Sequence, residues 1–264
     1  DVVIKHNNIT GNDDYGIYSS SSVDARYNWW GDASGPLESG DSINSVSLID
    51  ISPWLAYPVG TDPMHYVWVV EEGDSIKDAV DDAGDGDTVR IWAGDYNEMS
   101  SINIDTSISI IGNTTSSVII KLGQNGIDIN EEDVILKNFT LDSNYCSNRI
   151  DANRDNLVID RIKIHCDIEH EWMAVSGRAI EIGRNSSITI SNSTIQNFSF
   201  GILAQYSTNI HIKNNLFIDN YRHIDFWQDT DDIYIVNNTF VGVPVKPSGI
   251  GGTSTALWLG GTIN

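Results

Sequence analysis

The stretch from Ser187 to Phe240 contains one phrase three times: Ile188-Thr-Ile-Ser-Asn192-Ser-Thr-Ile195, Ile210-His-Ile-Lys-Asn214-Asn-Leu-Phe217 and Ile233-Tyr-Ile-Val-Asn237-Asn-Thr-Phe240. The phrases begin 22 and then 23 residues apart. Within each phrase apolar residues alternate with polar ones, which predicts a strand with one buried face. The Asn that ends the alternation tolerates the left-handed backbone of a sharp corner. A period in the low twenties predicts a solenoid, whose coils bury their apolar faces only by stacking.

The same phrase recurs along the chain, at 2–9, 23–30, 134–138 and 157–161, and a second strand of the Gly-Ile type recurs at 126–129 and 201–203. Alternation places one set of side chains inside the coils: Ile108, Ile110, Val134, Leu136, Leu157, Ile159, Ile188, Ile190, Ile210, Ile212, Ile233 and Ile235. At the corners we expect a structural ladder of stacked amides from Asn138, Asn192, Asn214 and Asn237, each bonded to the coils above and below.

Residues 67–112 have the order expected at the start of such a solenoid. A strand at Val67–Val70 precedes an amphipathic helix at Asp74–Ala83, with Asp74 as the expected N-cap and glycines at 84 and 86 behind it. The helix is followed by Gly-Asp-Thr, Ala-Gly-x-Tyr and Ile-x-Ile-x-Gly. This order resembles the entrance of pectin-lyase-like β-helices, where the helix closes the first coil. The resemblance implies an all-β fold, a right-handed parallel β-helix solenoid with a short capping α-helix.

A Trp-rich segment follows the first coils of the chain. Asn28-Trp29-Trp30-Gly31, Gly35-Pro36 and Ser52-Pro53-Trp54-Leu55 together resemble the closing element of right-handed β-helix repeat domains in archaeal and bacterial surface proteins, including S-layer and adhesin-like proteins. The resemblance implies that Trp29, Trp30, Pro53 and Trp54 form a cap over the open end of a core. The alternative is that the three indoles form a platform for stacking sugars.

These elements divide the chain into three parts. Residues 1–58 are expected to be the last coils and Trp-rich cap of a β-helix, 59–66 a linker, and 67–264 the cap helix and main β-helix, continuing into residues 1–58 of the next unit. The step from Leu257 across a head-to-tail junction to Val2 is nine residues, as is the step from Ile224 to Ile233. We therefore expect copies of the chain to assemble end to end, covalently or as subunits. The expected inter-unit interface contains Val2, Ile4, Leu257 and Leu259.

The charge limits the partners. A formal net charge of -22 opposes binding to nucleic acids and anionic membranes. The sequence contains no run of 18 apolar residues, so no membrane span is predicted in this segment. The densest acidic run supplies weak candidates for a metal site that would take Ca²⁺, or for an acid/base pair: Asp225, Asp229, Asp231 and Asp232. The alternative, a solvated turn between coils, is favoured, and no other cofactor is expected.

The cysteines and sequons indicate an extracellular glycoprotein. In the 23-residue alignment Cys166 pairs with Ser143, three positions from Cys146, so a disulfide between Cys146 and Cys166 is expected. Of the seven Asn-x-Ser/Thr sequons, those in the expected ladder are excluded, and Asn8, Asn185 and Asn197 are the expected glycosylation sites.

Together these features favour a structural, cell-surface β-helix module that assembles into a filament or tandem array and is not an enzyme. Arg161-Ile-Lys163 resembles a polygalacturonase motif, but that family's Asn-Thr-Asp and Gly-His-Gly motifs are absent, so no catalytic residues are assigned. Two alternatives remain open. One is a carbohydrate-active enzyme, a polysaccharide lyase or hydrolase. The other is an adhesin that binds glycans, or other cells, through exposed Trp172, Trp227 or Trp258.

Overall fold

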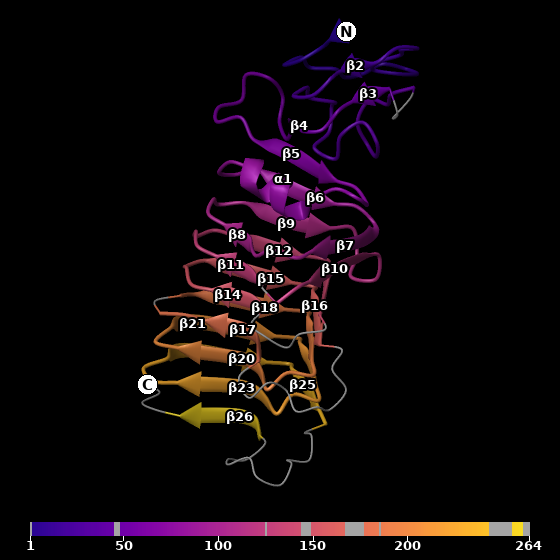
Figure 1. Ribbon diagram of the computed structural model, residues 1–264. Coiled ribbons are helices and arrows are strands. Elements are labelled where there is room, and N and C mark those ends of the chain that lie inside the picture. Colours follow the sequence, from indigo (N-terminus) through magenta and orange to yellow (C-terminus); the bar gives the residue numbers. More distant parts are fainter. Residues whose placement is uncertain are drawn as a thin grey trace.

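The computed structural model describes residues 2–44, 48–124, 126–143, 149–166, 177–184, 186–242 and 255–260. The chain winds into a column of stacked coils, which descends from the N-terminal strands to β26 (Figure 1). Each full coil adds one strand to each of three sheets, so that the sheets run along the column. The predicted β-helix with one short helix is confirmed.

The first sheet has nine strands in the described residues and starts next to the helix. Its strands, in spatial order, are β4 (Trp54–Leu55), β5 (Tyr66–Val70), β6 (Thr88–Ile91), β9 (Ser109–Gly112), β12 (Ile135–Lys137), β15 (Leu157–Asp160), β18 (Ile188–Ser191), β21 (Thr208–Lys213) and β24 (Asp231–Val236). All neighbours are parallel except β4 and β5, which are antiparallel.

The other two long sheets have seven strands each in the described part of the chain. The second sheet contains β7 (Gly94–Glu98), β10 (Val118–Leu122), β13 (Thr140–Ser143), β16 (Lys163–Cys166), β19 (Thr194–Gln196), β22 (Leu216–Ile218) and β25 (Thr239–Val241). The third sheet contains β8 (Ile102–Ile104), β11 (Ile127–Ile129), β14 (Ile150–Ala152), β17 (Arg178–Ile182), β20 (Phe200–Gln205), β23 (Arg222–Trp227) and β26 (Thr255–Gly260).

The register of the first sheet follows the sequence repeat. Ile188 pairs with Ile210, and Ile210 pairs with Ile233 in the next coil. Ten of the twelve predicted inward side chains are buried in one continuous core, and Ile233 and Ile235 in the last coil are partly buried against it. Burial of one such aliphatic side chain contributes roughly 1.5–3 kcal/mol, so stacking of the coils supplies most of the stabilisation.

The corner asparagines turn the chain, but the buried amide ladder lies one residue further along. Asn192 and Asn214 have φ of 52° and 58°, and both side chains are exposed. The buried side chain is Asn215, whose Oδ1 accepts from the Ser193 amide at 2.9 Å and whose Nδ2 donates to the Ile190 carbonyl at 2.9 Å. Of the ladder predicted at Asn138, Asn192, Asn214 and Asn237, one bond is present, from Asn214 Nδ2 to Asn192 Oδ1 at 3.4 Å, and it lies at the surface. Of the four following positions, Asn215 and Asn238 carry amides, whereas Phe139 and Ser193 do not. The residue in the left-handed conformation faces outward at the corner, and the next residue faces inward.

The short helix α1 (Ile76–Asp82) covers the start of the core. Its N-cap is Ser75, whose hydroxyl accepts from the Asp78 amide at 3.1 Å, and not Asp74 as predicted. A second acceptor is the buried carboxylate of Glu98, which receives the Ile76 amide at 2.6 Å. One hydroxyl and one carboxylate thus accept hydrogen bonds from main-chain amides that have no partner within the first turn of the helix.

The N-terminal segment forms a separate small sheet of β1 (Val2–Val3), β2 (Val23–Asp24) and β3 (Ile49–Asp50). Trp30, Pro53 and Trp54 are buried there and Trp29 is half-buried. The Trp54 Nε1 donates to the Ala33 carbonyl at 3.0 Å, and Trp30 and Trp54 belong to the same apolar cluster as Val67. These contacts favour the lid over the sugar platform, because buried indole faces cannot stack on a ligand.

Candidate functional site

The outward face of the third sheet gathers the side chains best suited to bind a ligand. Register places one residue per coil in a single row along this face: Asn103, Asp128, Asp151, Glu181, Leu203, Asp225 and Trp258. Neighbouring members lie on strands about 4.8 Å apart. Carboxylates therefore occupy three successive coils in the middle of the row, and an indole ends it.

The centre of the site is a buried ion pair on β23. Asp225 is fully buried, and its Oδ2 accepts from Arg222 Nη1 at 2.5 Å while its Oδ1 accepts from Trp227 Nε1 at 2.8 Å. Burial raises the pKa of the Asp225 carboxyl above its ordinary value, and the bonds from Arg222 and Trp227 oppose that rise. The pair holds the indole of Trp227 in a fixed orientation on the surface.

Two more rings surround the Arg222 guanidinium. It lies 4.6 Å from the ring centre of Trp258 and 5.6 Å from that of Phe200, within the range of cation–π contact. Trp227 is 43% exposed and Trp258 is 37% exposed. The glycan-binding alternative required these two rings at the surface, and they are there. Trp172 lies outside the described residues.

The same pairing is repeated two coils earlier. On β17, Arg178 Nη1 donates to Glu181 Oε2 at 2.6 Å, and Gln205 Nε2 donates to Glu181 Oε1 at 3.2 Å. Both pairs have the form Arg-x-x-acid, at 178–181 and 222–225. The sequence analysis missed these two arginines, although that repeated spacing was the signal that could have found them.

The acidic candidates for a metal site do not converge. Asp225 is buried in its ion pair, and Asp229 is exposed between β23 and β24 with φ of 46°. Asp231 and Asp232 begin β24, where Asp231 is half-buried and Asp232 is exposed with φ of 51°. Within the described ranges no group of three or more His, Cys, Asp or Glu side chains is placed to hold a metal ion. The solvated-turn alternative fits Asp229, whereas Asp231 and Asp232 lie on β24.

Cys166, at the end of β16, is buried and disulfide-bonded, and it pairs in register with Ser143 as the alignment required. Cys146 lies outside the described residues, so the pairing with it stays a prediction.

Two of the three glycosylation candidates can be placed. Asn8 is exposed, although its Oδ1 accepts from the Val59 amide at 2.7 Å. Asn197 is half-buried and its Nδ2 donates to the Cys166 carbonyl at 3.1 Å, which makes it a poor acceptor for a glycan. Asn185 lies outside the described residues. Asn192 and Asn237 are no longer excluded as glycosylation sites, because both side chains are exposed.

The expected inter-unit residues lie at opposite ends of the column (Figure 1). Val2 is 52% exposed on the edge strand β1, and Leu257 and Leu259 are 40% and 57% exposed on the edge strand β26. Ile4 is half-buried and packs against the N-terminal core. No helix in the described residues is long and apolar enough to cross a membrane.

A family model described as a right handed beta helix region matches residues 89–243, which is more than half of the chain. Two solved structures are similar. One is the ORF18 protein of Geobacillus virus E2, with 12% identity and a TM-score of 0.51 over 67% of this chain and 50% of that one. The other is a mutant of the PL6 family alginate lyase AlyGC, with 11% identity and a TM-score of 0.32 over 99% of this chain and 53% of that one. The chain thus spans about half the length of both, and no curated protein matches it.

The prediction that the protein is not an enzyme is wrong. The matched family is described by its fold alone, and that fold neither assigns nor excludes an activity. The absence of polygalacturonase motifs therefore does not exclude catalysis.

Proposed function

We propose that this chain, which belongs to the right handed beta helix family, binds a polysaccharide along the outward face of its third sheet. The observation that carries the proposal is the pair of half-exposed indoles, Trp227 and Trp258, placed on either side of the Arg222–Asp225 ion pair. Aromatic faces stack on the apolar faces of sugar rings, and an amphipathic ring beside fixed polar groups is a typical contact in such sites.

The charge of the face selects the class of polysaccharide. Beyond the buried Asp225 and Leu203, the row continues with the half-buried carboxylates of Glu181, Asp151 and Asp128, which a polysaccharide laid along the sheet would pass. The whole protein carries a formal net charge of -22. Both features repel polyanions, and we therefore assign neutral polysaccharides as the ligands.

Binding is tested by affinity electrophoresis against a panel of neutral polysaccharides and against alginate. We expect Trp227→Ala and Trp258→Ala each to weaken retention by about tenfold, the loss typical of an aromatic anchor. Tyr234→Ala is the matched control, because Tyr234 is 54% exposed on the first sheet in the same coil. Equal losses in all three variants, or retention by alginate alone, would refute the assignment.

Hydrolysis is a second candidate, favoured by two carboxylates in register. Asp151 and Glu181 are direct partners on β14 and β17, on strands about 4.8 Å apart. Retaining glycosidases use two carboxyl groups about 5–5.5 Å apart. Chromatography of products from a bound polysaccharide should show cleavage that falls at least about 100-fold in Glu181→Gln and is unchanged in Asp95→Asn. Loss of cleavage without loss of retention separates this role from binding.

End-to-end assembly outside the cell remains the proposal for the molecule as a whole. It is supported by apolar side chains on the last coil that solvent reaches: Val236 is 54% exposed and Leu259 57% exposed. The disulfide-bonded Cys166 supports an oxidising compartment. Light scattering should show mass that increases with concentration in the wild type and less so in Leu259→Asp. A constant monomer mass at high concentration would contradict assembly.

A further inference from the structure

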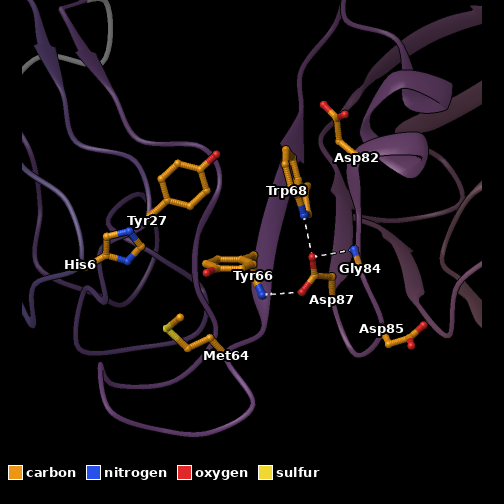
Figure 2. A pocket seen from close by; sticks show the side chains of 9 residues that line it. All are labelled: His6, Tyr27, Met64, Tyr66, Trp68, Asp82, Gly84, Asp85 and Asp87. Carbon is orange, nitrogen blue, oxygen red and sulfur yellow. Dashed lines mark hydrogen bonds between the residues drawn. The ribbon is translucent and has the colours of Figure 1, made fainter.

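A cavity of about 350 Å³ lies between the N-terminal segment and the helix-capped start of the β-helix (Figure 2). Its volume is at the lower end of the range for small-ligand pockets. Three aromatic rings and three carboxylates dominate its lining: Tyr27, Tyr66, Trp68, Asp82, Asp85 and Asp87. The elements β5 and α1, which contribute Tyr66, Trp68 and Asp82, lie far along the column from β23 and β26, which carry Trp227 and Trp258 (Figure 1). The cavity is therefore separate from the proposed polysaccharide face.

The rings form a rigid wall. Tyr27 and Tyr66 meet edge to face, with ring centres 5.5 Å apart and planes at 83°. His6 stacks behind Tyr27 at 5.8 Å. Trp68 is held by its Nε1, which donates to Asp87 Oδ2 at 2.9 Å. Figure 2 shows Tyr66 between Tyr27 on one side and Trp68 on the other.

The charge of the cavity is negative. Asp82 and Asp85 are exposed at its rim, and Asp87 is buried in its wall. No Lys or Arg side chain is among the residues that line it. The nearest cations, Lys5 and Arg26, lie over the Tyr27 ring and are paired with two carboxylates: both contact Asp24, and Arg26 also lies 3.4 Å from Asp50.

Both of those ion pairs are short. The Lys5 Nζ lies 2.6 Å from Asp24 Oδ2, and the Arg26 Nε lies 2.9 Å from Asp24 Oδ1. The two cations therefore leave the charge of the cavity itself uncompensated.

The hydrogen bonds in the cavity wall limit the class of ligand further. Asp87 Oδ1 accepts from the Tyr66 amide at 2.7 Å, and Oδ2 accepts from the Trp68 indole and from the Gly84 amide at 3.0 Å. These bonds use the indole donor and both carboxylate oxygens of the wall. A sugar, which needs donors as well as acceptors from its site, would find its side-chain donors only on Tyr27, Tyr66 and His6. An anion is repelled by the aspartates. A cation gains from the aromatic faces and from all three negative charges.

We propose that this cavity binds an organic ammonium group. The group could come from a free quaternary amine or from a lysine side chain of another protein, and both present a positive charge to aromatic faces and carboxylates. The quaternary group is the form that aromatic cages take best, because its charge is spread over methyl groups and its hydration is weak.

The proposal is tested by isothermal titration of the full chain with choline, with N-acetyl-lysine amide and with 3,3-dimethylbutan-1-ol, the neutral isostere of choline. We expect an ammonium ligand to bind at least about tenfold more tightly than the isostere, and added salt to weaken that binding. Tighter binding of choline assigns a free quaternary amine, whereas tighter binding of the lysine derivative assigns a protein side chain.

Variants locate the site. Tyr66→Leu and Asp85→Asn should each weaken ammonium binding by about fivefold or more, the effect of one cation–π or charge contact. Tyr18→Leu and Asp13→Asn, which change exposed residues of the same types outside the cavity, should leave it unchanged. Equal affinity for the isostere, no heat with either amine, or equal losses in the control variants would overturn the proposal.

Discussion

Replacing Asn215 by alanine should be far more harmful than replacing its neighbour Asn214. The Asn215 side chain is 2% exposed and makes three hydrogen bonds: with the Ser193 amide at 2.9 Å, with the Ile190 carbonyl at 2.9 Å and with Asn238 Oδ1 at 3.0 Å. Two of these partners are buried main-chain groups between coils. Truncation removes both of these bonds.

The magnitude follows from those two groups. An unsatisfied buried donor or acceptor costs about 1–3 kcal/mol, so Asn215→Ala should lower the free energy of unfolding by about 3–4 kcal/mol. Asn214 is exposed and its amide makes one long bond, 3.4 Å to Asn192 Oδ1. Asn214→Ala should cost about 1 kcal/mol, mainly because alanine is less tolerant of the left-handed backbone.

Urea unfolding followed by circular dichroism measures the difference. With an m-value of about 3 kcal/mol/M, the midpoint should fall by about 1 M in Asn215→Ala and by about 0.3 M in Asn214→Ala. If Asn214→Ala proved equal or worse, the buried ladder would lie at the corner residues after all, and the assignment of inward and outward side chains would fail.

Three further outcomes are expected. Burial lowers the pKa of His223 below its ordinary 6.5, so the unfolded chain binds more protons below about pH 6.5 and stability should be lost as pH falls through that range. His223→Gln should flatten this slope in denaturation at pH 5–8, and an unchanged slope would contradict this assignment. Trp30→Ala should cost about 3–5 kcal/mol because the ring is fully buried, and a loss no greater than that of Trp29→Ala would argue against a lid. Thiol labelling of the unreduced protein should detect no free cysteine, since Cys166 is disulfide-bonded; two labelled thiols would disprove the bridge.

The repeating part of the fold could be predicted from the sequence because its signal is local. Alternation of apolar and polar residues decides which face of a strand is buried, and the fixed period decides which strands are neighbours. Ile188, Ile210 and Ile233 accordingly form one column in the register that the spacing implies. The burial of Trp30 and Trp54 was expected from the resemblance of their segment to the closing elements of β-helix domains.

Only the tertiary structure decided which side chains face inward at the corners and which residues meet at the candidate sites. The step from Asn214 to Asn215 reverses the side-chain direction, and only the three-dimensional turn shows which of two adjacent asparagines points inward. Arg222 meets Trp258 across 36 residues of sequence. Tyr27 meets Tyr66 where two segments pack end to end. Such contacts join residues from different coils or segments, and no local pattern in the sequence records which side chains the stacking brings face to face.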